Sequence, residues 1–223
     1  NYDPPCAWIF PMMWRVVVLL ITVATLQGCS SSVEPPSLPP ASTVIIPDDY
    51  TTFTDISETF SVRYPDYWSL NLSEVELANE FLESSPLGLD LSQTVSVFSA
   101  GDETLGGYEP NLNIFLETVP DSYDADKYSE AGVRTIRDNL SSASIERQQS
   151  VQLGNIRGQI VEWSYGLSEV FPGESGRWNV MGVLAKRTGE SHGWSLACGF
   201  GEFAPPESRE TCNLVINSFR LLD

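Results

Sequence analysis

The chain alternates apolar and polar residues in several short stretches, and this two-residue period is the feature that most limits its possible folds. The clearest case is Phe60-Ser61-Val62-Arg63-Tyr64, which Pro65-Asp66 ends in a turn. Such alternation predicts half-buried β-strands. Further strands are predicted at 68–72, 94–98 and 112–117, and, separated by glycine-rich turns, at 151–153, 159–163, 178–184 and 194–198.

Two stretches have a helical period instead. Asp121 to Leu140 begins with acidic residues, which favour a helix N-terminus, and continues with apolar residues at helical spacing. A second helix is expected from about Pro206 to Phe219. Runs of neighbouring strands between two helices indicate a single α+β domain, an antiparallel β-sheet flanked by helices.

Two motifs resemble one known family. The segment from Phe60 to Trp68, FSVRYPDYW, is similar to the opening of PsbP-like domains, and Val215-Ile216-Asn217-Ser218-Phe219-Arg220 resembles their final helix. The family includes an extrinsic subunit of the photosynthetic oxygen-evolving complex and many bacterial lipoproteins, mostly without an assigned function. The resemblance spans 53–222 and implies a PsbP-like α/β sandwich at 48–223. It does not imply a photosynthetic role.

Residues 1–28 have the composition of a signal peptide, with the true start expected at Met12 or Met13. Met12-Met13-Trp14-Arg15 gives a basic start, and an apolar run of 11 residues follows, from Val16 to Leu26. As a helix this run would be about 16 Å long, which is shorter than the ~30 Å hydrocarbon core of a bilayer. It therefore suits a signal sequence rather than a permanent membrane span.

The run ends in Leu26-Gln27-Gly28-Cys29, which resembles the lipobox of bacterial lipoproteins. The resemblance implies cleavage before Cys29 and lipid on its sulfur, and several acyl chains anchor a protein stably to a membrane. In a cell with two membranes, Ser30 resembles the class sorted to the outer membrane, facing the periplasm. The alternative is an ordinary secretory signal with a chance cysteine.

Residues 29–47 contain the lipid-bearing cysteine and a linker rich in proline and serine. Pro35-Pro36 and Pro39-Pro40 favour polyproline II, which makes a semi-rigid spacer. We expect it to hold the domain away from the membrane.

The chain is strongly acidic, with 12 Lys+Arg against 30 Asp+Glu and a net charge of −18. A surface of this sign repels nucleic acid, so a nucleic-acid partner is not expected. The acidity is interpreted as solubility outside the cell, and a dedicated site for cations or basic partners is the alternative.

Cys198 and Cys212 remain in the domain once Cys6 and Cys29 are set aside. An even pair in an oxidising compartment predicts a disulfide, worth on the order of 3 kcal/mol for a loop of this length. Two reduced, buried thiols are the alternative.

Candidate catalytic groups are few. The single histidine, His192, lies in Thr188-Gly189-Glu190-Ser191-His192-Gly193, which is typical of a turn at a hairpin tip. Asp121, Asp124 and Asp126 could bind calcium weakly, but they are better explained as a helix start. The pair Asp102-Glu103 could likewise bind calcium weakly. We therefore predict no catalytic, cofactor-binding or metal-binding residues.

Four of the six tryptophans fall in strand patterns: Trp68, Trp163, Trp178 and Trp194. They are expected to fill the core between sheet and helices, and an aromatic binding face is the alternative.

The sequence favours a non-enzymatic function: a membrane-anchored lipoprotein of the cell envelope that binds or helps to assemble a protein partner. The alternative is a ligand- or cation-binding protein, or a hydrolase, that uses acidic residues from several loops.

Overall fold

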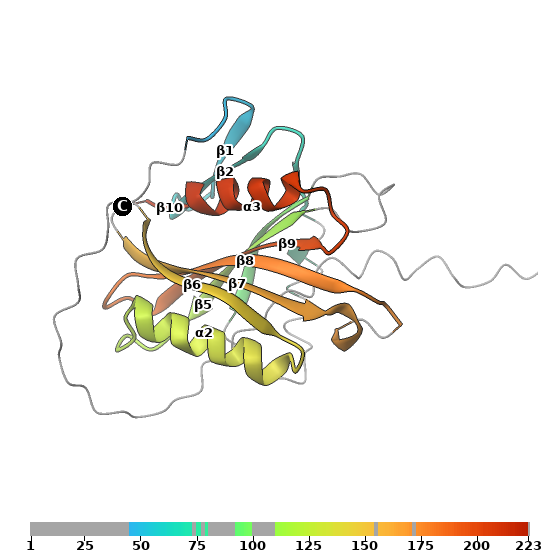
Figure 1. Ribbon diagram of the computed structural model, residues 1–223. Helices are drawn as coiled ribbons and strands as arrows, with labels where there is room; N and C mark the ends of the chain where they lie inside the picture. The colour runs from blue at the N-terminus through green and yellow to red at the C-terminus, as the bar shows by residue number, and fades with distance from the viewer. Residues whose placement is uncertain are drawn as a thin grey trace, which may run out of the picture.

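The computed structural model describes residues 45–72, 75, 76, 79, 92–99, 110–153, 156–170 and 173–222. Strands dominate this part of the chain (Figure 1). In chain order they are β1 (Tyr50–Thr54), β2 (Phe60–Pro65), β3 (Ser69–Leu70), β4 (Ser92–Ser99), β5 (Asn111–Thr118), β6 (Ser144–Leu153), β7 (Ile156–Gly166), β8 (Arg177–Lys186), β9 (His192–Gly201) and β10 (Arg220–Leu221).

Helices accompany these strands in the described part of the chain: α2 (Ala125–Asn139), the 3-10 helix η3 (Leu167–Glu169) and α3 (Glu207–Ser218). Asp124 caps α2, because its carboxylate accepts a hydrogen bond from the backbone N–H of Lys127.

The strands form two antiparallel sheets. The larger has seven strands in the order β3-β4-β5-β9-β8-β7-β6, and the smaller has three in the order β1-β2-β10. The strand β6 pairs only with β7 in this order, so it is an edge strand.

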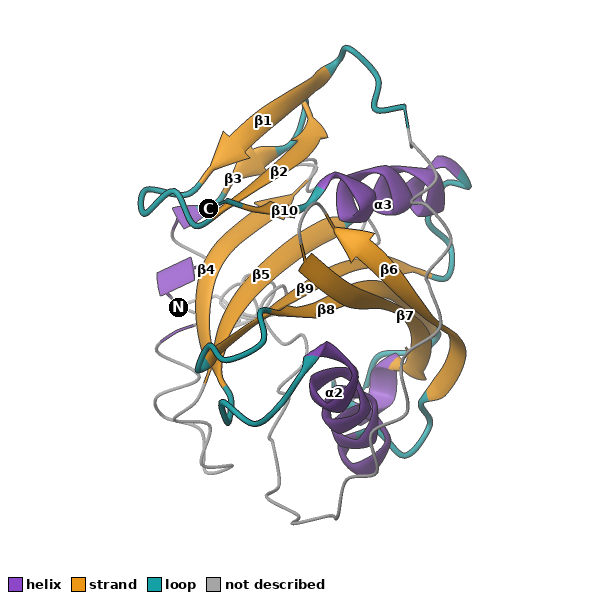
Figure 2. Cartoon of the chain, turned by 90° about the vertical axis from the view of Figure 1, so that its left-hand side faces the viewer, coloured by secondary structure: helices purple, strands orange, loops and turns teal. Residues whose placement is uncertain are grey.

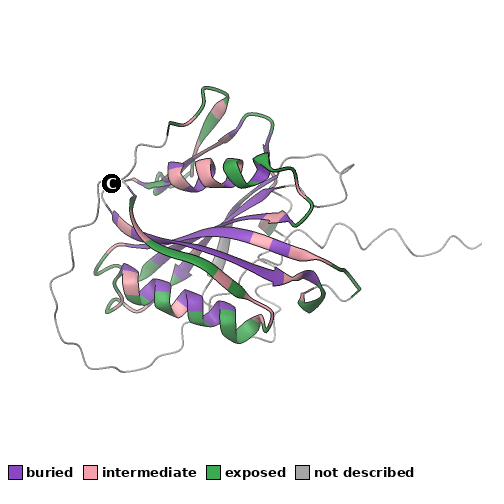
Figure 3. Cartoon of the chain, viewed as in Figure 1, coloured by how far each residue is buried: buried purple, intermediate pink, exposed green. Residues whose placement is uncertain are grey.

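The large sheet separates two apolar cores (Figure 2). On one face, α2 packs over β6, β7 and β8. On the other face, α3 packs over β8 and β9 and against β2 of the small sheet. Strand β6 extends beyond the cover of α3, and most of its residues are exposed (Figure 3).

The tryptophans predicted to lie in the core do so. Trp68 and Trp194 belong to the core beneath α3, whereas Trp163 and Trp178 belong to the core beneath α2. This confirms the core interpretation over an aromatic binding face.

The predicted α+β class with an antiparallel sheet and flanking helices is confirmed.

Several predicted boundaries of strands and helices were wrong. The strand predicted at 68–72 is reduced to β3, and residue 72 is already helical. The first helix begins at Ala125 rather than Asp121, because a turn precedes its cap. Strand β6 begins seven residues before the predicted start at 151 (151 − 144), and β1 was not predicted.

Candidate functional site

Glu162 joins the edge of the large sheet to α3. It lies on β7, and its side chain is only 6% exposed. Its two carboxylate oxygens accept hydrogen bonds from two different arginines. Arg147 of β6 donates from Nη1 at 2.9 Å, and Arg209 of α3 donates from Nη2. One buried carboxylate therefore orients two cationic side chains from separate elements.

The strand geometry explains the first of these contacts. Arg147 lies directly opposite Glu162 in the β6 and β7 ladder, so the two side chains are cross-strand neighbours on the same face. Gln149 lies two residues farther along β6 and therefore on that face as well. Its Oε1 accepts hydrogen bonds from Nε and Nη2 of Arg147, which holds the guanidinium in place.

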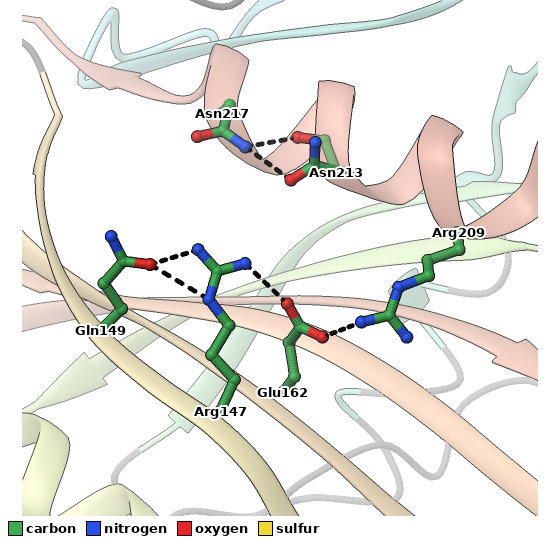
Figure 4. Close-up of polar contacts among 6 residues, drawn as sticks. All are labelled: Arg147, Gln149, Glu162, Arg209, Asn213 and Asn217. Atoms are coloured by element: carbon green, nitrogen blue, oxygen red, sulfur yellow. Dashed lines mark hydrogen bonds and ion pairs between the residues drawn. The ribbon is translucent and has the colours of Figure 1, made fainter. Parts of the chain in front are cut away.

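The helix supplies a second row of polar side chains. Arg209, Asn213 and Asn217 follow one another at four-residue spacing, so they lie on one side of α3. Nδ2 of Asn217 donates to the backbone oxygen of Asn213 at 2.7 Å and to its Oδ1 at 3.0 Å. Figure 4 shows this row facing the strands that carry Arg147, Gln149 and Glu162.

We call these six residues the Glu162 surface: Arg147, Gln149, Glu162, Arg209, Asn213 and Asn217. The two guanidinium side chains are 44% and 57% exposed for Arg147 and Arg209. With one carboxylate among them, the six side chains carry a formal charge of +1, in a chain of net charge −18. The Glu162 surface is thus locally cationic and rich in hydrogen-bond donors.

A second polar cluster is buried beneath α2. Glu117 of β5 is 2% exposed, and within the described residues neither carboxyl oxygen makes a hydrogen bond. Burial raises the pKa of Glu117 to about 8, although the nearby hydroxyls of Tyr128 and Ser195 act to lower it. Burial also raises the pKa of Tyr128. These groups are enclosed by the core, so they do not form a binding surface.

The structure describes some of the residues predicted from the sequence and not others. Cys29 lies outside the described residues, as do Asp102 and Glu103. Cys198 of β9 and Cys212 of α3 are both fully buried and are joined by a disulfide, with their Cα atoms 5.5 Å apart. The disulfide ties α3 to the large sheet. No helix in the described part of the chain is long and apolar enough to span a bilayer.

Two of the three aspartates considered for calcium have structural partners, and the third, Asp121, lies exposed in the turn before α2. Asp124 caps the helix, and Asp126 accepts from Nε2 of Gln159 and pairs with Arg157 at 3.2 Å. Across the described ranges, no group of three or more His, Cys, Asp or Glu residues is arranged to hold a metal ion.

His192 was predicted to lie in a turn, but it is the first residue of β9, opposite Thr118 of β5. The side chain is exposed, and its Nδ1 lies 3.3 Å from the Ser191 hydroxyl. Its neighbour Ser191 precedes the strand.

The Glu162 surface was not predicted from the sequence. One signal was present, since Glu162 interrupts the otherwise apolar run Ile160-Val161-Glu162-Trp163. A charged residue in a strand buried on both faces requires a partner. The partners are 15 and 47 residues away, so local patterns could not identify them.

No family model and no curated protein sequence matches this chain. Solved structures do match. One is the Ran-binding protein Mog1p of Saccharomyces cerevisiae, with a TM-score of 0.50 and 9% identity, over 78% of this chain and 96% of that protein. Another is LpqN, involved in cell envelope biogenesis of Mycobacterium tuberculosis, with a TM-score of 0.50 and 11% identity, over 78% and 91%. At these identities the likeness concerns the fold alone, which is a Mog1/PsbP-like α+β fold in a single domain.

Proposed function

We propose that this chain is a lipid-anchored, non-catalytic module of the cell envelope that binds a protein partner through the Glu162 surface. The observation that carries the proposal is the pair of half-exposed guanidinium groups that one buried carboxylate fixes between β6 and α3. Arginine side chains held in place lose little conformational freedom on binding, which is why they suit recognition of a partner.

The fold neighbours support this kind of role. Mog1p is described as Ran-binding, and LpqN as involved in cell envelope biogenesis. The lipobox resemblance at Leu26-Gln27-Gly28-Cys29 supports an anchor, and the linker that follows would keep the Glu162 surface accessible to neighbouring proteins.

Membrane fractionation of the full chain and of Cys29→Ala tests the anchor. We expect the wild type in the membrane fraction with added acyl mass and the variant in the soluble fraction. Equal solubility of both, with no added mass, would contradict lipid anchoring.

Site-specific photo-crosslinking in intact cells tests the binding surface. A photoreactive amino acid at Gln149 should give a defined crosslinked product, and one at the exposed Arg134 of α2, on the opposite face of the sheet, should not. The Gln149 product should disappear in the double variant Arg147→Gln/Arg209→Gln. The same product from both positions, or no product from Gln149, would count against the proposed surface.

A further inference from the structure

Strand β6 offers a pairing edge next to the Glu162 surface. It is ten residues long and is the last strand of the large sheet, so within the described residues its outer edge has no strand partner. Natural proteins discourage pairing at edge strands with charged side chains, above all lysine, with proline and with bulges. Residues 144–153 contain no proline or lysine. The two charged residues, Glu146 and Arg147, and the one irregularity, between Ile145 and Arg147, lie near the start of the strand, so residues 148–153 are regular and uncharged.

The side chains next to this edge define which partner would fit. A strand added to β6 would lie about 4.8 Å away, and its alternate side chains would face the same side as Arg147 and Gln149. Cross-strand neighbours lie about 5 Å apart between Cβ atoms, so a partner side chain opposite Arg147 would meet its guanidinium.

The charges there favour a carboxylate. Glu162 and Gln149 accept the donors of Arg147, and Glu162 accepts from Nη2 of Arg209. Among the described residues, Glu162 is the one partner of the Arg209 guanidinium, which leaves its Nε and Nη1 as donors. A basic partner would have to displace both arginines from a carboxylate that is only 6% exposed. An acidic partner could accept hydrogen bonds from the arginines without displacing their contacts to Glu162 and Gln149.

The net charge of −18 does not reverse the local preference of the two arginines for a carboxylate. At physiological ionic strength the screening length is about 8 Å, so charges farther away contribute little to the energy of a direct contact. The acidic remainder of the surface would instead slow the approach of an acidic partner.

We propose that the partner docks as an extended acidic segment, which adds a strand to β6 and places carboxylates against Arg147 and Arg209. This inference rests on the proposed function and specifies the chemistry of the partner. Main-chain hydrogen bonds to β6 would supply affinity, and the two arginines would supply the selectivity for carboxylates.

Titration of the ¹⁵N-labelled domain with short capped peptides tests the proposal. One peptide alternates threonine with glutamate, and matched peptides carry glutamine or lysine in place of glutamate. The glutamate peptide should bind about tenfold more tightly than the glutamine peptide, as expected for a charge-assisted contact. Its binding should shift the amide signals of β6 and the Nε signals of Arg147 and Arg209.

Protein variants and modified peptides separate the two parts of the proposal. Arg147→Gln and Arg209→Gln should each remove most of the preference for glutamate, whereas Arg134→Gln, which removes the same charge on the opposite face of the sheet, should leave it unchanged. N-methylation along one edge of the peptide should abolish binding, and along the other edge should not, because only one edge pairs with β6.

Tighter binding of the lysine peptide, or equal effects of Arg134→Gln and Arg147→Gln, would overturn the proposal. So would binding to anionic phosphatidylglycerol vesicles that depends on both arginines, without any binding of the peptides. If photo-crosslinking from Gln149 still captures a partner in that case, the proposed function stands and only the acidic strand is wrong.

Discussion

The ring of Tyr128 occupies the space that a side chain at Gly193 would fill. A Cβ built on Gly193 would lie 2.7 Å from Cζ of Tyr128, closer than real Cβ atoms approach other heavy atoms. Gly193 lies opposite Glu117 in the β5 and β9 ladder. The missing side chain therefore allows α2 to seat its tyrosine directly on the sheet, above the buried carboxyl.

Replacement of Gly193 by alanine should destabilise the domain by about 1 to 3 kcal/mol, because the added methyl group overpacks this contact. Urea denaturation of the wild type and Gly193→Ala would measure the loss. In the double variant Gly193→Ala/Tyr128→Leu the two effects should be non-additive, since the smaller side chain leaves room for the methyl group. Additive effects would show that Tyr128 is not what opposes the methyl group.

The stability of the domain should fall as the pH rises through the neutral range. Burial raises the pKa of Glu117 to about 8 in the folded protein, whereas in the unfolded chain the pKa returns to its ordinary value of 4.5. The folded state therefore holds a proton that the unfolded state releases, and stability is lost between these two values. A shift of this size corresponds to roughly 5 kcal/mol.

Glu117→Gln should remove this pH dependence, because an amide does not ionise. The wild type and the variant should be similar near pH 5, and the variant should be more stable near pH 9. Denaturation curves at several pH values would measure this difference. The exposed Glu130→Gln on α2 is the matched control and should follow the wild type. Parallel curves for all three proteins would show that Glu117 is not the group responsible.

The strands and helices that could be predicted are those whose own residues show the apolar pattern of that element. The strand at 178–184 is a mostly apolar run in a sheet buried on both faces, and the structure extends it only to Arg177–Lys186. The polar half of β6 carries no such signal. Ser144 to Ser150 reads as SIERQQS, since an edge strand outside the cover of α3 has little to bury on that side.

The Glu162 surface was missed for a different reason. Arg147, Glu162 and Arg209 lie on three elements, and their meeting depends on how α3 crosses the sheet. The sequence gives no direct information on that crossing. The disulfide between Cys198 and Cys212 could be predicted, because the choice was limited to two remaining cysteines.

Removal of this disulfide should cost about 3 kcal/mol, as expected for a closed loop of about 15 residues. The double variant Cys198→Ala/Cys212→Ala avoids free thiols and keeps small side chains at two fully buried positions. Its melting temperature should fall, and reducing agent should then have no further effect. Full stability of the double variant would mean that core packing alone holds α3 on the sheet.

The turn between β1 and β2 depends on one carboxylate. Asp55 accepts hydrogen bonds from the backbone N–H groups of Ser57, Thr59 and Phe60, at 3.2, 2.6 and 2.9 Å, and from the Thr59 hydroxyl at 3.0 Å.

Asp55→Ala should destabilise the domain by about 1 to 2 kcal/mol, since these donors lose their carboxylate partner and return to water. The loss should appear as faster amide exchange in β1 and β2, whereas exchange in β7 and β8 should change less. The matched Asp49→Ala lies just before β1 and should have little effect, because the backbone oxygen that accepts from the N–H of Asp66 is kept by alanine. Equal exchange in both variants would show that pairing with β10, rather than the turn, holds the hairpin.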